Sequence, residues 1–448
     1  MRSIFALLFV IAVTASGCGG LPSRLDATLA PLVKKFPSAT ILVERDDRIV
    51  FRKAYGFADL ENRAPATMDT VYCIGSISKQ LGAAAILQLV EAGKLRLDDK
   101  LARFYPDFPH ADAITIHDLL HHTTGITDFE YNGPWPKTMA VARTKEEVIG
   151  MFRDLPFQFD PGTRWSYSTS NYYLLGMIVE KVSGQPLEAY LEKNIFARAG
   201  LRHTSFCDPQ TLIPHHAFGY DVDPQKGFIP TRPTLLTQFG IGGGLCSTAG
   251  DLLAWQHALE EGRVVSADSY RLMSTPAPLA DGTPTGYGYG LFPSDLDGHP
   301  MIGHSGGVAG FSADLNHYVR DHLRVVVLTN TEQGPIYDLE RLIAATVLGL
   351  PPLVALPITP AELAVYAVTI PEDPGKLEFA VDGDHLSVRF VSDKKPPSKV
   401  RPLIHIGVDS FESATRGFKV TFERKDGRVV RTRVDRAGMT SYATPIAN

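Results

Sequence analysis

Two β-hairpin patterns, far apart in the chain, constrain the fold more than any other feature of the sequence. The first, Ala39 to Asp59, reads ATILVERDDRIVFRKAYGFAD and places β-rich runs on either side of Asp46-Asp47. The second, Ala313 to Asn330, reads ADLNHYVRDHLRVVVLTN and turns at Arg320-Asp321. Between them, helical patterns alternate with loops rich in proline and glycine. Strands at both ends of one region, with helices between, predict an antiparallel sheet whose terminal strands come together, and therefore an α+β fold.

A second, smaller domain is expected after this region. The stretch Gly349 to Pro360, GLPPLVALPITP, is rich enough in proline to predict a linker over residues 350–360. Beyond it, residues 361–448 contain short alternating runs that include KLEFAV, HLSVRF, FKVTFE and RVVRTRV. Such runs predict a small all-β, barrel-like accessory domain of consecutive strands. The main domain is then expected over residues 25–349.

The first residues of the chain have the shape of an export signal. Arg2 supplies positive charge, an apolar run follows from Ile4 to Val13, and the small residues Ala-Ser-Gly precede Cys18. The pattern predicts a signal peptide over residues 1–17 and a tether over residues 18–24. Because Ala-Ser-Gly-Cys resembles the bacterial lipoprotein cleavage box, Cys18 is expected to carry a lipid that anchors the protein in the periplasm or at the outer membrane. Ordinary signal cleavage, with Cys18 incidental, is the alternative.

Charge and cysteine content narrow the range of partners. The net charge is −5 and no extended stripe of lysine and arginine is present, so a nucleic-acid partner is not expected. Besides Cys18 the chain has three cysteines, Cys73, Cys207 and Cys246. An odd number leaves at least one thiol free, and a single disulfide is possible in an oxidising compartment, with its partners undetermined. No Cys-x-x-Cys pair points to a metal or redox centre, so neither a metal nor a cofactor is expected.

The segment Tyr72 to Leu95, YCIGSISKQLGAAAILQLVEAGKL, predicts a helix that begins beside a hydroxyl and an amine. Residues i and i+3 share one helix face, so Ser76 and Lys79 are expected about one turn apart. The unpaired N–H groups of the first turn favour negative charge on the serine oxygen and oppose positive charge on the lysine. A serine needs a neighbouring base to attack a carbonyl group, and a neutral lysine can serve. The alternative is that Ser76 only caps the helix.

Two further stretches combine polar groups with close backbone approach. Pro161 to Gly184, PGTRWSYSTSNYYLLGMIVEKVSG, places Tyr167 in a loop of serines and threonines just before a predicted helix. A core-packing tyrosine is the alternative there. Gly303 to Phe311, GHSGGVAGF, contains glycines that would let the backbone lie close to a ligand, and it leads into a predicted strand.

Together and in this order, the three stretches resemble the serine β-lactamase and penicillin-binding-protein superfamily. IGSISKQ carries its Ser-x-x-Lys motif, YST stands where the family has Tyr-x-Asn, and HSG stands where it has Lys-Thr-Gly or His-x-Gly. The connecting phrases LRLDDKLARFYPDFP, ITIHDLLHHTTGI and IGGGLCSTAGDLLAWQ resemble it too. The similarity covers Leu25 to Gly349 and is closer to the branch of class C β-lactamases, D-Ala-D-Ala carboxypeptidases and esterases. It implies an antiparallel sheet flanked by helices.

The resemblance assigns an expected role to each matching position. Ser76 would be the acylated nucleophile, Lys79 its proton acceptor, and Tyr167 a second base that serves the leaving group and later a water molecule. The backbone N–H groups of Ser76 and Gly307 would form the oxyanion hole. The remaining matches would bind substrate: Thr169, His304, Ser305 and Gly306. The substrate would be a small ester, peptide or β-lactam.

Two positions depart from the family pattern. Thr169 replaces an asparagine whose amide holds both the lysine and the amide carbonyl of the substrate, and a threonine hydroxyl offers one donor where the amide offers two. His304 replaces a lysine that would pair with the carboxylate of a β-lactam. Both changes favour an esterase or a specialised amidase over a β-lactamase.

Three other interpretations compete with this one. Gly303 to Gly307 also fits the Gly-x-Ser-x-Gly elbow, with Ser305 as nucleophile, but that elbow needs a helix after it, and a strand-like run follows. His117, His121 and His122 include the i,i+4 spacing of a zinc site, yet the His-Glu-x-x-His frame is missing. Helix-surface or capping histidines are the alternative. Finally, because Thr169 departs from the family pattern, a lipid-anchored binding or regulatory module with a decayed site is the third alternative.

Overall fold

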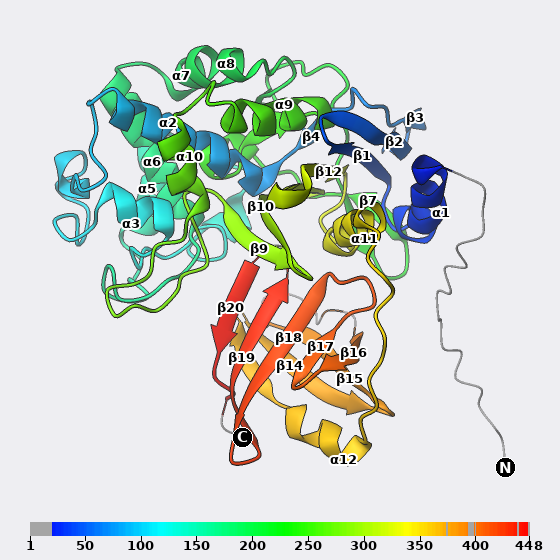
Figure 1. The fold of residues 1–448 in the computed structure, drawn as a ribbon. Helices are drawn as coiled ribbons and strands as arrows, with labels where there is room; N and C mark the ends of the chain where they lie inside the picture. Colours follow the sequence, from blue (N-terminus) through cyan, green and yellow to red (C-terminus); the bar gives the residue numbers. More distant parts are fainter. Residues whose placement is uncertain (1–19, 373–374, 393–397, 399, 437–438, 447–448) are drawn as a thin grey trace.

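The computed structural model describes residues 20–446 except 373–374, 393–397, 399 and 437–438 (Figure 1). The expected signal peptide and Cys18 lie outside these residues. The first described helix, α1 (Leu21–Val33), begins within the stretch 18–24 that the sequence suggested as a tether. Within the described ranges, no helix combines the length and the apolar character needed to span a bilayer.

A seven-stranded antiparallel sheet forms the centre of the main domain (Figure 1). Its strands are, in order, β3 (Ala64–Pro65), β2 (Arg48–Asp59), β1 (Ser38–Arg45), β12 (Leu323–Thr329), β11 (Phe311–Tyr318), β10 (His299–Val308) and β9 (Phe292–Leu296). The first strand pairs with the last strand of the second hairpin, with Ala39 opposite Thr329. Asp46 and Asp47 both have positive φ, as a tight hairpin turn requires. The predicted α+β fold with joined terminal strands is confirmed.

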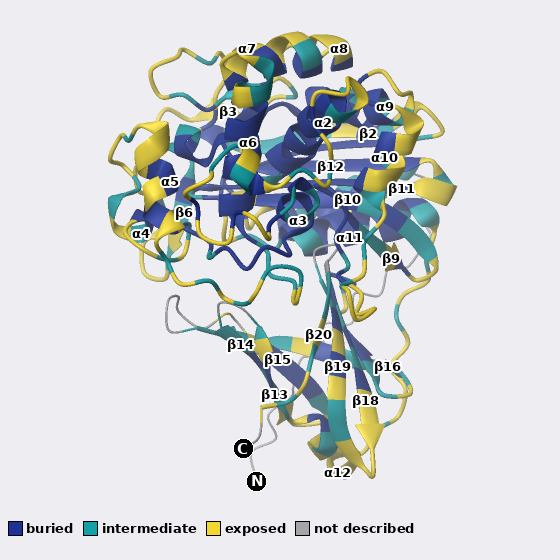
Figure 2. Cartoon of the chain, turned by 90° about the vertical axis from the view of Figure 1, so that its left-hand side faces the viewer, coloured by how far each residue is buried: buried dark blue, intermediate teal, exposed yellow. Residues whose placement is uncertain are grey.

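Alternate side chains of the central strands enter two different cores. Leu42 of β1 belongs to a large core shared with the helices of one face, whereas Ile41 and Val43 belong to a smaller core. The smaller core is covered by α1 and α11 (Ile336–Leu348). Because successive strand residues point to opposite faces, a strand that is buried along its length must be apolar on both faces. Figure 2 shows these strands largely buried, with exposed residues on outer helices, on loops and on the C-terminal strands.

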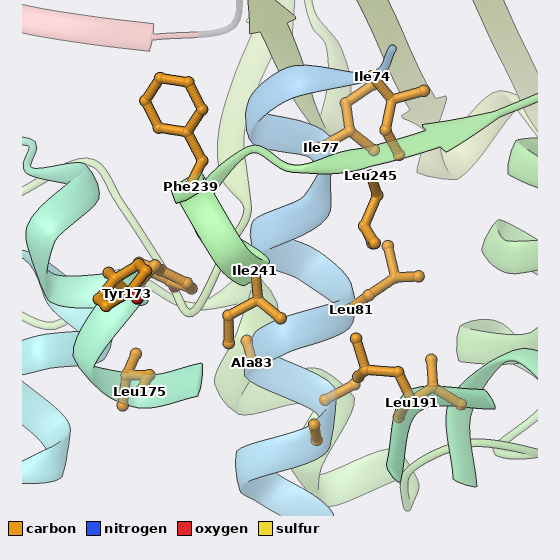
Figure 3. Packing of buried hydrophobic residues seen from close by; sticks show 14 of the residues in the cluster. Ile74, Ile77, Leu81, Ala83, Tyr173, Leu175, Leu191, Phe239, Ile241 and Leu245 are labelled. Atoms are coloured by element: carbon orange, nitrogen blue, oxygen red, sulfur yellow. The ribbon is translucent and has the colours of Figure 1, made fainter. Parts of the chain in front are cut away.

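Most of the helices contribute buried side chains to the large core. They are α2 (Ser78–Glu91), α3 (Ile116–His121), α4 (Trp135–Thr138), α5 (Lys145–Arg153), α6 (Thr169–Ser183), α7 (Leu187–Leu191), α8 (Ala197–Ala199), α9 (Ala249–Glu260) and α10 (Ala267–Ser274). Ile241 lies between α2 and α6 (Figure 3), and a Cβ atom on Gly82 would be 2.5 Å from its Cδ1 atom. A Cβ on Gly176 of α6 would be 3.2 Å from its Cγ1 atom. Glycine on both helices therefore makes room for this side chain.

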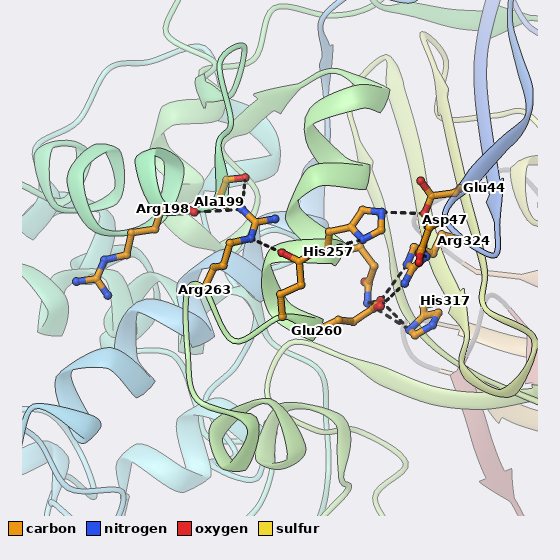
Figure 4. Close-up of polar contacts among 11 residues, drawn as sticks. Glu44, Asp47, Arg198, Ala199, His257, Glu260, Arg263, His317 and Arg324 are labelled. Carbon is orange, nitrogen blue, oxygen red and sulfur yellow. Dashed lines mark hydrogen bonds and ion pairs between the residues drawn. The ribbon is translucent and has the colours of Figure 1, made fainter.

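A buried arginine ties the hairpin strands to a helix (Figure 4). Arg324 of β12 donates to Glu44 of β1 at 2.8 Å and, through Nε, to Glu260 of α9 at 3.1 Å. His257 lies 2.8 Å from Glu44, and His317 lies 3.0 Å from Glu260. The Arg324 side chain is only 5% exposed, so its charge depends on these carboxylates.

The C-terminal region contains the expected barrel-like β-sheet, and a short helix, α12 (Pro360–Leu363), contributes Leu363 to its core. Its eight strands pair in sequence order: β13 (Thr369–Glu372), β14 (Gly375–Asp382), β15 (His385–Val391), β16 (Arg401–Gly407), β17 (Ser410–Glu412), β18 (Phe418–Lys425), β19 (Arg428–Arg436) and β20 (Met439–Ala443). The N–H of Ile446 donates to the carbonyl of Thr369 at 2.8 Å, which brings the two ends of this curved sheet together. Asp338 of α11 accepts from Arg401 at 2.7 Å and from Thr415 at 2.5 Å, so the unit is docked on the main domain.

Candidate active site

Ser76 and Lys79 lie together at the start of α2. Ser76 belongs to the short 3-10 turn η1 (Gly75–Ile77), which follows strand β4 (Tyr72–Cys73) and leads directly into α2. The Nζ atom of Lys79 lies 3.0 Å from the Oγ atom of Ser76. No side-chain capping hydrogen bond is present at the start of η1 or of α2, so Ser76 is not a helix cap.

The lysine amine is fully enclosed. Lys79 has no exposed surface, and its Nζ atom donates to the carbonyl oxygen of Gly242 as well as to Ser76. The Tyr167 ring centroid is 4.8 Å from the same nitrogen. Burial lowers the pKa of Lys79 to about 8, although the charges of Glu130 and Asp128 raise it. Near neutral pH a minority of this lysine is therefore neutral, and that form can accept a proton.

Tyr167 packs beside the lysine, just before α6 begins. Its ring centroid lies 4.4 Å from that of His122. Its hydroxyl oxygen is buried and forms no well-aligned hydrogen bond with any described residue. Burial raises the pKa of Tyr167 well above its usual range, while the nearby Ser76 hydroxyl lowers it. The phenol is therefore protonated at neutral pH, and its oxygen lies close to the candidate nucleophile.

The backbone of strand β10 lies against the nucleophile turn. A Cβ atom on Gly306 would collide with the carbonyl oxygen of Ile74 and would lie 3.0 Å from the backbone nitrogen of Ser76. A Cβ on Gly75, whose φ is +50°, would lie 2.8 Å from the nitrogen of Gly307. Glycine is required at both contact points, and the backbone N–H groups of Ser76 and Gly307 are brought to the same small region. This is the arrangement an oxyanion hole needs, and the role itself stays a prediction.

Thr169 makes polar contacts with two acidic residues, and its expected substrate-binding role stays a prediction. Its backbone N–H donates to the Asp128 carboxylate at 3.0 Å, and its hydroxyl lies 3.4 Å from Oε2 of Glu130. Its methyl group packs against Gly242, where a Cβ atom would lie 2.8 Å from Thr169 Cγ2. The amine of Lys79 donates to a main-chain group, the carbonyl of Gly242.

His304 and Ser305 occupy opposite faces of β10. The Nε2 atom of His304 lies 3.1 Å from the Tyr287 hydroxyl and its Nδ1 atom lies 2.5 Å from the carbonyl of Ser305. Burial, followed by the charge of Lys79, lowers the pKa of His304 to about 3, so the ring is neutral. Both ring nitrogens thus already have protein partners. Ser305 accepts from the Tyr337 hydroxyl of α11 at 3.4 Å, which places its side chain toward that helix. The substrate-binding roles expected for these two side chains stay predictions that this arrangement does not favour.

The structure also shows the surroundings of the residues in the two competing site interpretations, Ser305 and the three histidines. Ser305 lies inside β10, which turns back into β11 instead of entering a helix, so the strand–turn–helix context of a nucleophile elbow is missing. His117 bonds the Tyr289 hydroxyl at 2.7 Å, and His121 bonds the Tyr287 carbonyl at 2.8 Å. His122 accepts from the backbone N–H of Ser168 at 3.2 Å. Each of the three rings is engaged by protein groups.

Several residues of the site were not identified from the sequence. Asp128 and Glu130 come from the loop after α3, and Gly242 comes from the 3-10 segment η4 (Leu236–Gly242). Glu332 borders the other side, since its Cγ atom lies 3.8 Å from the point a Cβ on Gly307 would occupy. The run of three glycines that contains Gly242 was a signal of close backbone approach. The carboxylates had no comparable signal, because a surface loop commonly contains acidic residues.

The fold and the Ser76–Lys79 pair define a serine hydrolase of the β-lactamase and penicillin-binding-protein class. The chain belongs to the Beta-lactamase family, whose model matches residues 25–348. It is 33% identical over 300 residues to the penicillin-binding-protein relative PbpX of Bacillus subtilis, an alignment that covers 66% of this chain and 71% of that protein.

Other relatives extend the comparison. The chain is 29% identical over 321 residues to the D-aminopeptidase of Brucella anthropi, with 70% of this chain and 60% of that enzyme covered. Among solved structures, the octameric penicillin-binding protein homologue from Pyrococcus abyssi superposes with a TM-score of 0.65 at 27% identity. That superposition covers 95% of this chain and 99% of the other, so it includes the C-terminal β unit.

Proposed function

We propose that this protein hydrolyses small acyl substrates through an acyl-enzyme on Ser76. The observation that carries the proposal is the 3.0 Å contact between Ser76 and an enclosed lysine whose pKa is about 8. Lys79 accepts the proton as the Ser76 oxygen attacks the carbonyl carbon. The N–H groups of Ser76 and Gly307 bind the oxygen that becomes negative. Tyr167 passes a proton to the leaving group, and water then releases the acyl group and regenerates Ser76.

The charges around the site favour substrates without a carboxylate. Asp128, Glu130 and Glu332 all contribute negative potential at Tyr131, where the charge of Glu130 is the largest cause of a raised pKa. His304 is neutral and supplies no cation. An anionic β-lactam is therefore repelled, whereas a neutral ester or an acyl group with a free ammonium is accepted. We propose esters and amides of D-amino acids as the substrate class, which agrees with the D-aminopeptidase relatives.

The protein is also proposed to work in the cell envelope. The signal-like residues 1–17 and the Ala-Ser-Gly-Cys sequence support export and a lipid on Cys18, with the enzyme in the periplasm or at the outer membrane. A lipid on Cys18 would keep the enzyme close to small acylated compounds of the envelope.

Mass spectrometry with a fluorophosphonate tests the central proposal. The intact protein is expected to gain one adduct, which peptide mapping places on Ser76, and Ser76→Ala is expected to gain none and to lose activity by about 10³-fold or more. An adduct on Ser305, or none on the wild type, would contradict an acyl-enzyme on Ser76. The second result would favour the binding-module interpretation. Rates with a p-nitrophenyl ester, a D-alanine anilide and a chromogenic cephalosporin then rank the substrate classes.

A further inference from the structure

His122 contacts the chain on both sides of Tyr167. Its carbonyl oxygen accepts a hydrogen bond from the backbone N–H of Ser166 at 3.0 Å, and its ring Nδ1 atom accepts one from the backbone N–H of Ser168 at 3.2 Å. Between these two contacts, the ring centroid of Tyr167 lies 4.4 Å from that of His122. One residue therefore contacts Tyr167, the residue before it and the residue after it.

The Nδ1 atom of His122 must be an acceptor. The backbone N–H of Ser168 can only donate to it, and the Nδ2 atom of Asn171, from α6, lies 3.2 Å from the same nitrogen. The orientation of that amide is set by Thr124, whose hydroxyl donates to Asn171 Oδ1 at 2.7 Å. The proton of the neutral ring is therefore on Nε2. Burial, followed by the charge of Lys79, lowers the pKa of His122 well below its usual range, which keeps Nδ1 available as an acceptor.

His122 also has a left-handed backbone conformation, with φ +62° and ψ +38°, at the end of α3. Such a conformation is uncommon for residues other than glycine, and it persists where surrounding contacts hold it. The side chain has no exposed surface, and the rings of Tyr167, Tyr172 and Tyr287 lie with their centroids 4.4, 5.2 and 4.8 Å from its own. Glycine would end the helix without strain, so helix termination alone does not account for a buried histidine here.

We propose that His122 is a positioning residue for Tyr167. The inference rests on the proposed function, in which Tyr167 receives the Ser76 proton from Lys79 and gives its own to the leaving group as the bond to the carbonyl carbon breaks. The two N–H contacts fix the backbone on either side of the tyrosine, and the adjacent imidazole fixes its ring. The phenol is thereby kept beside Lys79, whose Nζ atom lies 4.8 Å from the ring centroid. The imidazole itself transfers no proton in this role, since its Nδ1 atom already accepts from two donors.

Substrates that differ in their leaving group differ in how much they need a well-placed Tyr167. An anilide nitrogen must be protonated as it leaves, whereas p-nitrophenolate is stable without a proton. General acid catalysis contributes about 10²–10⁴-fold where the proton is needed. A displaced Tyr167 should therefore slow the hydrolysis of an anilide strongly and that of an activated ester only slightly.

His122→Gly tests this role, because glycine adopts the left-handed backbone and removes both the Nδ1 acceptor and the ring. We expect kcat/KM for D-alanine p-nitroanilide to fall by about a hundredfold or more, and that for D-alanine p-nitrophenyl ester, corrected for spontaneous hydrolysis, by less than about tenfold. A fluorophosphonate should still label Ser76, since fluoride leaves as an anion. His122→Asn should recover part of the anilide rate, because its amide oxygen can accept from the Ser168 N–H and asparagine tolerates the left-handed backbone. His215→Gly is the matched control, at an exposed histidine whose φ is +60°, and should change neither rate.

A double variant separates positioning of Tyr167 from a general loss of structure. Tyr167→Phe should lose anilide hydrolysis, and adding His122→Gly should cause little further loss, because residues that act as a unit have non-additive effects. If His122→Gly does not fold, His122→Asn decides in its place: its loss must be larger for the anilide than for the ester and must disappear in the Tyr167→Phe background.

Equal losses for the two substrates, or additive losses in the double variant, would overturn the positioning role. Labelling of Ser76 in the wild type would then leave the acyl-enzyme proposal standing, whereas an unlabelled wild type would overturn both proposals.

Discussion

Lys79 donates a hydrogen bond to the carbonyl oxygen of Gly242, a residue 163 positions away in the sequence. That carbonyl directs the amine toward Ser76, which lies 3.0 Å away. Gly242 approaches Thr169 so closely that a Cβ atom would be 2.8 Å from the threonine methyl group. The position of the candidate base thus depends on a main-chain group that only glycine can place here.

Gly242→Ala is therefore expected to lower kcat/KM. The added methyl group pushes the segment away from Thr169 and moves the acceptor of Lys79, and a shift of about 1 Å can cost about a hundredfold in rate. Thr169→Ser removes the opposing methyl group, so the double variant should recover much of the loss. Ester hydrolysis measures both effects. Gly150→Ala, at a helix position with open space, is the control and should be neutral. A double variant no better than Gly242→Ala would rule out this contact as the cause.

The pH profile should report the neutral form of Lys79. Because the unprotonated amine is the base, kcat/KM is expected to rise as pH increases through about 8, the pKa of Lys79, and to level off above it. Glu130 raises that pKa, so Glu130→Gln should lower it and move the rise to lower pH. Glu423→Gln, an exposed carboxylate of the C-terminal unit, should leave the profile unchanged. A Glu130→Gln profile that moves to higher pH would contradict the assignment.

The wild-type enzyme is expected to prefer a p-nitrophenyl ester to a chromogenic cephalosporin. Thr169→Asn restores an amide and should raise cephalosporin turnover relative to ester turnover, by up to roughly a hundredfold if its hydrogen bonds, ~1–3 kcal/mol, form in the transition state. His304→Lys should raise cephalosporin turnover by less than a lysine–carboxylate pair would suggest. The position is buried and lies near the charge of Lys79, so a second ammonium group is disfavoured there. Values of kcat/KM for both substrates decide this, and a wild type that favours the cephalosporin would refute it.

Arg324→Met is expected to destabilise the main domain strongly. The change leaves Glu44 and Glu260 without their principal cation, and breaking a buried pair of this kind costs about 3–5 kcal/mol. Thermal and urea unfolding measure the loss. Arg96→Ala provides the comparison, because the Arg96–Asp98 pair is 75% and 69% exposed and should contribute little. Equal stabilities for the two variants would show that the Arg324 network is not important for folding.

Cys18→Ser should release the protein from the membrane. Fractionation of expressing cells is expected to show the wild type with the membranes and the variant in the soluble envelope fraction, because the anchor is a lipid on this residue. The mature wild-type chain should begin at Cys18 with the added mass of acyl chains. A variant that stays membrane-bound, or a different mature terminus, would be decisive against lipidation.

The sequence alone determined those parts of the protein that depend on short stretches of chain. Alternating apolar residues around Asp46 and Asp47 predicted the first hairpin, since strand period and turn chemistry are local properties. The spacing of Ser76 and Lys79 likewise follows from one helical turn. Glycine in the Gly303 to Gly307 segment signalled close approach of the backbone, and the structure places that segment against the nucleophile turn.

Only the tertiary structure decided what surrounds this local framework. The carbonyl that holds Lys79 and the carboxylates that raise its pKa belong to residues far from it along the chain, and Cys207 and Cys246, which form a disulfide, are also far apart in the sequence. No local pattern encodes such contacts, because they form only where the folded path of the backbone brings distant segments together. Burial has the same origin: the low pKa of His304 and the enclosure of Lys79 result from packing of the whole core, which removes water from groups that would be charged on the surface.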